Sequence, residues 1–385
     1  MMLSPNPLSL LCAILLCLPL AIFFTTTTTI TITSITTTSS STIHIPDKKS
    51  NPNLTTTFLS INTQHNKSIK PTTIDEYKEE ETLFIVANHT KRKATWPRKI
   101  AFMFLTTTPL PFASLWESYF NQIPKNLYNI YIHADPTFSY DPPFSGVFSN
   151  RLIPSKPTAR FSPTLTSAAR RLLARALIDD RSNYIFILLS SSCIPLHSFN
   201  FTYNILINSS KSFIEILNNE PSSYDRWAAR GEHAMLPTVK LEDLRIGSQF
   251  WALTRKHARL VVSDRKIWSK FNKPCIRLDT CYPEENYFST LINMWDPKGC
   301  VHATLTHVDW KGRDDGHPRT YVADEVCPEL IWSLRRDRPR YGDDNGDSKG
   351  GWSWRRRDPF LFARKFSAEC LQPLMEIADG VIFKD

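Results

Sequence analysis

Short apolar runs alternate with amphipathic segments between residues 99 and 192 of this chain. The apolar runs cover residues 99–105, 127–136 and 184–192, and the amphipathic segments cover 111–120 and 163–179. Short apolar runs rich in β-branched and aromatic residues favour buried strands, whereas apolar residues spaced by three and four favour helices. The order strand, helix, strand, helix, strand therefore predicts an α/β fold around a sheet of parallel strands.

Polar side chains follow each of these predicted strands. Threonines occupy residues 106–108 after the first strand, His133 and Asp135 end the second, and serines and a cysteine occupy 190–193 after the third. Sheets of parallel strands bind ligands at the carboxyl ends of their strands. We therefore expect a ligand site at these positions.

The second half of the chain has a less regular pattern and no internal repeat. It predicts, in order, a strand at 248–254, a helix at 255–263, a helix after Pro283, a strand at 302–310, a glycine-rich loop at 311–318 and a basic segment leading to 361–366. With 385 residues, 42% of them hydrophobic, the chain can build one large domain or two smaller ones.

The N-terminal quarter predicts a membrane anchor and a stem. Residues 8–24 are uncharged and mostly apolar, which fits a short membrane span after a cytoplasmic tail at 1–7, and also fits the core of a cleaved signal peptide. Residues 25–96 are polar and begin with a run of Thr and Ser, so they cannot bury enough apolar surface to fold. We expect the folded domain to cover 97–385 and to lie in the secretory lumen.

Sequons and cysteines agree with a lumenal domain. The candidate N-glycosylation sites are Asn53, Asn66, Asn88, Asn200 and Asn208. An even number of cysteines outside the apolar segment predicts up to three disulfides in an oxidising lumen, with the pairing left open. These cysteines are Cys193, Cys275, Cys281, Cys300, Cys327 and Cys370.

The formal net charge of +9 indicates an anionic partner. Nucleic acid, acidic lipid and nucleotide phosphate all fit that charge, but the apolar N-terminus and the sequons disfavour a nucleic-acid-binding module. The chain lacks GxxxxGK[ST] and GxGxxG, which disfavours P-loop and dinucleotide-binding enzymes. It also lacks GxSxG, the nucleophile turn of many hydrolases.

The sequence offers no clear metal site for a nucleotide sugar. No predicted strand ends in Asp-x-Asp, and the acidic run at 343–347 fits a solvated turn. We therefore expect no metal or other cofactor, and a bound diphosphate would have to be met by side-chain cations such as Arg355, Arg364 and Lys365. The alternative is that these residues form a solvated basic run.

Two adjacent carboxylates stand at the start of the helix predicted after Pro283. Acidic residues are favoured in the first turn of a helix by its dipole, which explains Glu284 and Glu285 without any catalytic role. A carboxylate at the rim of a cleft can also accept the proton of an attacking hydroxyl. Both interpretations are compatible with one helix.

Nine motifs in order resemble the plant branch of the core-2/I-branching β-1,6-N-acetylglucosaminyltransferase family. They are "PRKIAFMFLTT-PLP", "LYNIYIHADP", "SNRLIPS", "ARRLLARALID", "LLSSSCIPL", "GSQFWALTR", "CYPEENYFSTL", "LTHVDW…GHPRTY" and "LFARKF". The resemblance implies a GT-A-like (Rossmann-like) glycosyltransferase domain in a single-pass type II Golgi membrane protein. It further implies inverting chemistry, a UDP-sugar donor, a glycan or glycoprotein acceptor and no metal.

The same resemblance implies roles for individual residues. Glu285 matches the catalytic glutamate of the family, and Lys365 matches the lysine that contacts the donor diphosphate, with Arg364 and Arg355 as neighbouring cations. "YIHAD" is similar to the segment that faces uridine, which implicates His133 and Asp135.

The chain departs from the family pattern at several positions. The plant family commonly has acidic residues where Ala169 and Ser191 stand, and a tryptophan where Phe250 stands. The Trp-Gly expected near residues 161–162 is also missing. Because two carboxylates are lost near the expected donor site, an alternative is an inactive or divergent member that acts as a lumenal glycan-binding or scaffold protein.

Overall fold

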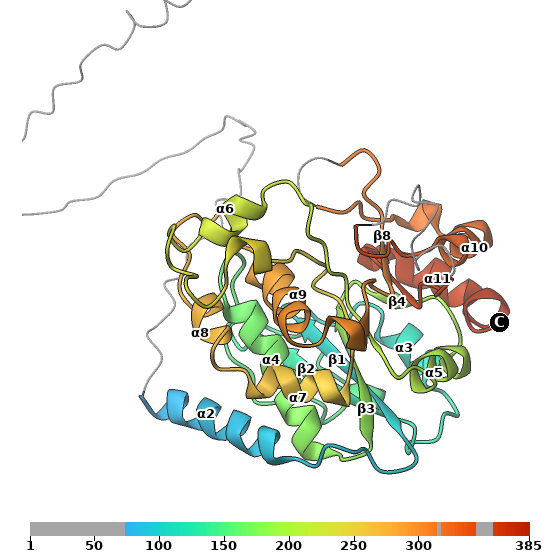
Figure 1. Ribbon diagram of the computed structural model, residues 1–385. Helices are drawn as coiled ribbons and strands as arrows, with labels where there is room; N and C mark the ends of the chain where they lie inside the picture. Colours follow the sequence, from blue (N-terminus) through green and yellow to red (C-terminus); the bar gives the residue numbers. More distant parts are fainter. Residues whose placement is uncertain (1–73, 314–316, 344–356) are drawn as a thin grey trace, which may run out of the picture. The chain divides into compact units, whose positions relative to one another are not determined.

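Three apolar runs form the parallel strands at the centre of the fold (Figure 1). The structure is a computed structural model, and it describes residues 74–313, 317–343 and 357–385. Strand β1 (Lys99–Thr106) lies between β2 (Tyr128–Ala134) and β3 (Asn183–Ser190) and runs parallel to both. The parallel sheet predicted from the sequence is therefore confirmed.

The sheet continues beyond β3 with short strands. In the described part of the chain its order is β2-β1-β3-β6-β5-β7, and β6 runs antiparallel to β3. A second sheet has the order β4-β9-β8. The short strands are β4 (Ile194–Pro195), β5 (Ser212–Phe213), β6 (Ala252–Thr254), β7 (Cys300–Val301), β8 (Thr306–Val308) and β9 (Phe362–Arg364). Because β4 follows the end of β3 and pairs with β9, residues 362–364 are brought to the carboxyl end of the main sheet.

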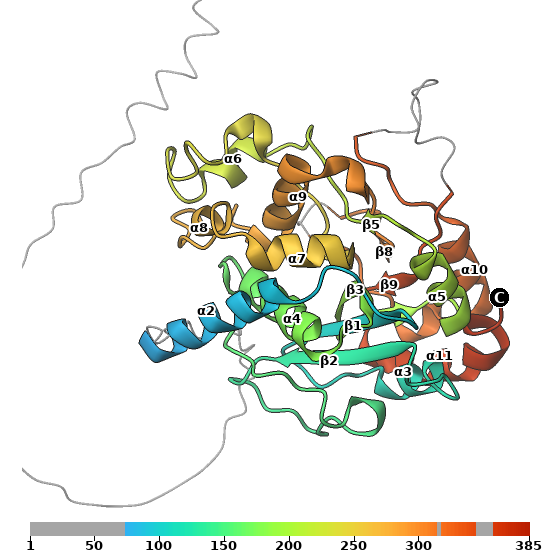
Figure 2. The ribbon, with the colours of Figure 1, turned by 60° about the horizontal axis from the view of Figure 1, so that its bottom comes forward.

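Helices cover both faces of the main sheet. The helices are α2 (Ile74–His89), α3 (Ala113–Tyr119), α4 (Thr164–Asp179), α5 (Phe199–Ile207), α6 (Ser223–Ala228), α7 (Arg255–Ser263), α8 (Trp268–Phe271), α9 (Pro283–Trp295), α10 (Pro328–Arg336) and α11 (Leu371–Ile377). Helices α4 and α7 lie over one face, with α2 alongside them, and α5 lies on the other face (Figure 2). The helices predicted at 163–179 and 255–263 and after Pro283 are confirmed.

The two faces follow from the alternation of side chains along β1. Ala101 and Met103 belong to the core beneath α4 and α7, whereas Phe102 and Phe104 belong to the core on the opposite face. Strand side chains point alternately to either side of a sheet, so an uninterrupted apolar strand must be covered on both faces. This explains why β1 is buried along nearly its whole length.

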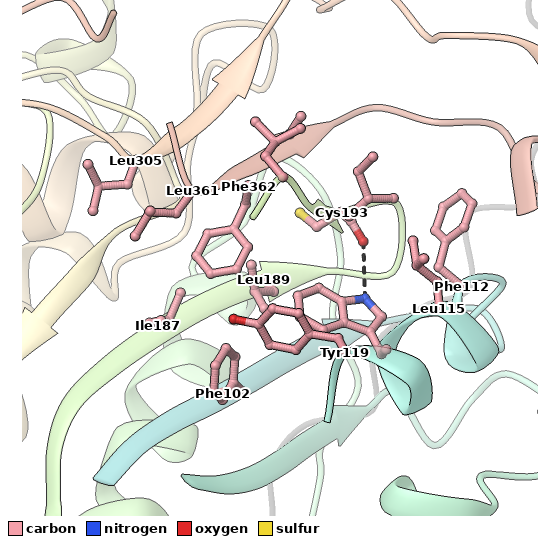
Figure 3. Packing of buried hydrophobic residues seen from close by; sticks show 14 of the residues in the cluster. Phe102, Phe112, Leu115, Tyr119, Ile187, Leu189, Cys193, Leu305, Leu361 and Phe362 are labelled. Atoms are coloured by element: carbon pink, nitrogen blue, oxygen red, sulfur yellow. Dashed lines mark hydrogen bonds between the residues drawn. The ribbon is translucent and has the colours of Figure 1, made fainter. Parts of the chain in front are cut away.

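The core on the α5 face links α3 to the turn after β3. The indole Nε1 of Trp116 donates a hydrogen bond of 3.2 Å to the carbonyl of Cys193 (Figure 3). The Trp116 ring lies 5.3 Å from that of Phe104 and 6.1 Å from that of Phe362 on β9. Aromatic packing thus fixes the position of β9 relative to the end of the main sheet.

Helix α2 lies within the range expected to be stem, and it packs against the domain. Leu83 and Ala87 are buried in the core that α4 and α7 share. The Arg259 guanidinium donates to the carbonyl of Asn88 (2.9 Å) and to that of Thr90. The packed unit therefore extends to the N-terminal side of Pro97. This polar segment can pack because its few inward-facing apolar residues fall on one face of α2.

Several sequence-based predictions concern residues outside the described ranges. They include the tail at 1–7, the apolar segment at 8–24, most of the expected stem, Asn53, Asn66 and Arg355. In the part that the structure does describe, no helix combines the length and the apolar character that crossing a bilayer requires.

The described sequons are exposed, and one disulfide is present. Asn88, Asn200 and Asn208 are all solvent-exposed, as glycan acceptors need to be. Cys275 and Cys281 form a disulfide. The other four cysteines of the predicted set are free, so one of up to three disulfides is formed; they are Cys193, Cys300, Cys327 and Cys370.

Candidate active site at the start of α9

Helix α9 begins with Pro283 in its first turn, followed by the two glutamates. Proline suits this position because its fixed φ is helical and its missing N–H would have no helical partner there. The two carboxylates that follow have different surroundings. Glu284 is buried, whereas the side chain of Glu285 keeps 35% of its surface exposed.

Glu285 is paired with an arginine from α6. Its Oε2 accepts a hydrogen bond of 2.6 Å from Nη1 of Arg226. The Arg226 guanidinium also lies 4.7 Å from the centre of the Tyr282 ring, which limits its movement. The carboxylate is thus held in one orientation while part of it remains open to solvent, an arrangement that suits a general base.

Glu284 points into the protein. Burial raises its pKa to about 7, an effect that a hydrogen bond from its own backbone opposes and the charge of Glu285 reinforces. Its Oε2 has no hydrogen-bond partner in the described structure. The neutral acid is therefore well populated at Glu284 near pH 7, and the two neighbouring glutamates differ in burial and in their partners.

The backbone of "GSQF" supports the first turn of α9. The amide of Gly247 donates a 2.9 Å hydrogen bond to the carbonyl of Glu285. A Cβ at this glycine would lie 2.1 Å from the carbonyl oxygen of Glu215 and 2.5 Å from Oγ of Ser289. Only glycine allows this close approach, so Gly247 has a structural role in placing Glu285.

Burial also raises the pKa of Glu215 to about 7. The charge of Glu285 adds to that increase, while Arg340 opposes it. The site thus contains another carboxyl group whose environment favours the neutral form.

Arg364 on β9 lies within electrostatic reach of Glu285. Burial lowers the pKa of the Arg364 guanidinium, and Cys193 and Glu285 oppose that decrease. The guanidinium stacks on the Phe250 ring at 4.5 Å, and its Nε is buried without a hydrogen-bond partner in the described structure. The structure thus brings together two residues that the sequence singled out 79 positions apart.

Lys365 follows Arg364 at the end of β9 and is half-buried. Its carbonyl accepts a 2.8 Å hydrogen bond from the amide of Tyr321. The amide of the next residue, Phe366, donates to the carbonyl of Ser192 at 3.3 Å. The segment that carries both predicted cations is therefore fastened to the turn after β3.

The ends of β1 and β3 meet at the same edge. Oγ1 of Thr108 donates a 3.1 Å hydrogen bond to Oγ of Ser191, one of the positions where this chain lacks the expected carboxylate. The Sγ of Cys193 lies 3.2 Å from Oγ of Ser190. A hydroxyl pair thus stands where the motif resemblance led us to expect an acidic side chain.

His133 and Asp135 are fully buried and have protein partners. The two carboxylate oxygens of Asp135 accept hydrogen bonds of 2.6 to 2.8 Å from the amides and hydroxyls of Thr137 and Thr158. These bonds lower the pKa of Asp135, although burial opposes the decrease. Both residues hold loops in place at the end of β2, and their predicted contact with uridine remains a prediction.

Three residues of the site were missed by sequence reasoning. Arg226 lies in "YDRW", which matches no motif, and Glu215 lies in an apolar segment. Arg160 is the third: its charge opposes the increase in the pKa of Glu284, and its Nη2 donates to Nε2 of His317 at 3.3 Å. The neighbouring Phe161 ring lies 5.6 Å from that of Tyr282. These contacts join residues that are far apart in the sequence, so no local spacing pattern could have predicted them.

A Ser-His-Asp arrangement elsewhere in the fold is structural. Nδ1 of His257 lies 2.7 Å from Oγ of Ser212, and its Nε2 lies 3.0 Å from Oδ2 of Asp296. Ser212 and His257 have no exposed surface, so no substrate reaches the hydroxyl. Among the described residues, no group of three His, Cys, Asp or Glu side chains is placed to hold a metal ion.

Comparison with known proteins identifies the family. A model of the Core-2/I-Branching enzyme family matches residues 100–335, which is more than half of the chain. Over 314 residues the chain is 28% identical to Glycosyltransferase BC10 of Oryza sativa subsp. japonica. The aligned region covers 73% of this chain and 76% of that protein. The family predicted from the sequence motifs is confirmed. The chain belongs to the Core-2/I-Branching enzyme family.

Proposed function

We propose that this protein is an inverting glycosyltransferase that moves a sugar from a UDP-sugar donor to a hydroxyl group of a glycan or glycoprotein. The observation that carries the proposal is the partly exposed carboxylate of Glu285, oriented by Arg226 and within electrostatic reach of the half-buried guanidinium of Arg364. Family membership and the similarity to a plant glycosyltransferase support the reaction class.

In the proposed reaction, Glu285 accepts the proton of the acceptor hydroxyl. The hydroxyl oxygen then forms a bond to the anomeric carbon of the sugar while the bond from that carbon to UDP breaks. One displacement inverts the configuration at that carbon, so the reaction needs one base and no covalent nucleophile. The products are the extended acceptor and UDP.

The departing UDP carries negative charge, which the protein has to stabilise in the transition state. We assign this role to Arg364 and Lys365 on the β9 segment, with no metal ion required. Arg355 is a further candidate cation, and it lies outside the described residues. Guanidinium and ammonium groups bind phosphate oxygens through charge-assisted hydrogen bonds.

We further propose a lumenal domain in the Golgi, attached through residues 8–24 as a type II anchor. The exposed sequons at Asn88, Asn200 and Asn208 and the disulfide between Cys275 and Cys281 support an oxidising, glycosylating compartment. Microscopy of the tagged full chain together with glycosidase treatment tests this placement. Cytosolic signal without a glycosidase-sensitive mass change would contradict it.

Ligand binding and turnover test the function. We expect UDP to raise the melting temperature of the purified full chain, and one member of a UDP-sugar panel to release UDP faster when an acceptor glycan mixture is added. Without such stabilisation at millimolar UDP, and without turnover of any donor, the chain would instead be the non-catalytic glycan-binding or scaffold protein.

A further inference from the structure

We infer that Glu80, on a helix that precedes the expected catalytic domain, positions the segment 155–158 at the carboxyl end of β2. Through that segment, Glu80 sets the affinity for the donor. The inference rests on the proposed function and on the predicted contact between the donor's uridine and the end of β2. It makes α2 part of the catalytic unit rather than part of a linker.

Glu80 is the shared partner of two cations. Its Oε1 accepts a 2.8 Å hydrogen bond from Nη2 of Arg171 on α4, and its Oε2 lies 3.2 Å from Nζ of Lys156. The side chain of Arg171 is only 5% exposed, so its charge depends on a protein partner. One carboxylate on α2 thus connects α4 with the loop after β2.

The segment 155–158 is in turn fastened to β2 along its length. The amide of Ala134 donates to Oγ of Ser155 at 3.2 Å, and the amide of Lys156 donates to Nε2 of His133 at 3.3 Å. The amide of Thr158 donates to Asp135 at 2.6 Å. Each contact joins the segment to one of the last residues of the strand or to the residue that follows it.

His133 lies against both residues that pair with Glu80. Its Nε2 faces the backbone amide of Lys156 at 3.3 Å and Nη1 of Arg171 at 3.4 Å. Two donors aimed at one nitrogen require an unprotonated Nε2, and hence a neutral ring. Losing Glu80 leaves Arg171 and Lys156 without their common carboxylate, directly beside a residue of the strand end.

The contact between α2 and this segment depends on polar interactions. A cavity of about 170 Å³ lies between them, lined by Glu79, Glu80, Leu83, Pro154, Ser155, Lys156, Arg171 and Arg175. Helix α2 itself is held elsewhere, by the buried Ala87 and by Arg259 bonded to the carbonyl of Asn88. Removing the Glu80 carboxylate therefore loosens the contact between the segment and α2, while the helix stays docked and the segment keeps its bonds to β2.

The loosened segment continues directly into the site. Residues 159–161 follow it, and Arg160 and Phe161 lie beside Glu284 and Tyr282 at the start of α9. The effect of Glu80 should nevertheless fall on donor binding. Glu80 contacts Arg171 and Lys156, and both lie against His133 at the end of β2, where uridine is predicted to bind.

Steady-state kinetics of Glu80→Ala test the inference, with Glu81→Ala as the matched control. Glu81 is on the same helix and pairs with Arg265 at 3.4 Å, but both side chains are exposed. We expect Glu80→Ala to raise the KM for the UDP-sugar about 3- to 20-fold, with kcat within about twofold of wild type. Glu80→Asp, which keeps the charge, should recover part of the affinity, and Glu81→Ala should leave KM unchanged.

Amide hydrogen exchange gives a second readout that does not depend on activity. In the full chain, Glu80→Ala should speed exchange at Lys156 and Thr158 about tenfold or more, while Glu81→Ala should not. Unchanged exchange in Glu80→Ala, or an equal increase in both variants, would overturn the inference. If exchange responds as expected but no UDP-sugar is turned over by wild type, the positioning role stands and the proposed function fails.

Discussion

At the scale of single residues, two adjacent glutamates of α9 have different surroundings. Glu284 is buried with its pKa raised to about 7, and Glu285 forms an ion pair at the surface of the site. The sequence alone explains both as residues favoured by the helix dipole. Their difference comes from partners that lie far away in the chain, above all Arg226.

Arg226 should matter for turnover because it orients the proposed base. We expect Arg226→Gln to lower kcat about tenfold or more, since the carboxylate of Glu285 loses its charged partner, and Arg226→Lys to lower it less. The control is Arg277→Gln, which breaks an exposed pair with Asp225. Equal kcat values for Arg226→Gln and Arg277→Gln would show that the ion pair plays no part in the reaction.

At the scale of elements, the start of α9 is positioned by other segments. The amide of Gly247 bonds to the carbonyl of Glu285, and Oγ of Ser289 donates a 2.8 Å hydrogen bond to the carbonyl of Glu215. These contacts connect the start of α9 to the extended segments beside it, so the proposed base is held by the framework of the domain rather than by a loop.

We expect Gly247→Ala to destabilise the protein by about 1–3 kcal/mol, because the new methyl group would overlap the carbonyl of Glu215. Gly380→Ala is the matched control, since nothing lies within 4 Å of the position that a Cβ would take at that glycine. Urea unfolding of both variants measures the difference. A Gly247→Ala free energy of unfolding equal to that of Gly380→Ala would contradict this packing.

The sequence predicted the presence of the long strands and helices better than it predicted how they pack against one another. The long apolar runs identified β1, β2 and β3, because a strand buried on both faces needs an uninterrupted run. The antiparallel direction of β6 was not predicted, because a three-residue strand takes its direction from its partners. Residues 74–89 were expected to be stem because the segment is polar and has few apolar residues. Those few residues stabilise α2 only through contact with the core of α4 and α7, which the sequence does not show.

The candidate site was predicted in part for similar reasons. Motif resemblance singled out Glu285 and Arg364, and the structure places them within electrostatic reach. Spacing gave no sign of Arg226, since a side-chain ion pair across 59 positions leaves no local pattern. His133 and Asp135 are fully buried and bonded to neighbouring loops, and their expected contact with a ligand stays a prediction.

At the scale of the whole molecule, buried titratable groups make stability depend on pH in opposite directions. Burial, followed by the charge of Arg171, lowers the pKa of His133 from 6.5 to about 4. Its stabilising contribution is complete above pH 6.5 and is lost as the pH falls towards 4, because the unfolded chain binds the proton more readily. Glu284 contributes below pH 4.5 and loses that contribution as the pH rises to about 7.

Single variants should separate these opposed contributions. As the pH falls from 7 to 4, wild type should lose up to about 3 kcal/mol of unfolding free energy that His133→Gln does not lose, apart from any constant difference between the two proteins. As the pH rises from 4.5 to 7, wild type should lose a similar amount that Glu284→Gln does not lose. Urea unfolding across this range measures both slopes, and parallel curves for wild type and either variant would contradict the assigned burial effect.

The proposed function depends most directly on Glu285 being the base of a sugar transfer. The most direct measurement is the rate of transfer from the preferred UDP-sugar by Glu285→Gln, beside Glu284→Gln as the neighbouring control. We predict a loss of more than about 100-fold in kcat for Glu285→Gln. Glu284→Gln should stay within about threefold of wild type, because an amide resembles the neutral acid at that position. Transfer by Glu285→Gln at the wild-type rate would contradict the assignment of the base.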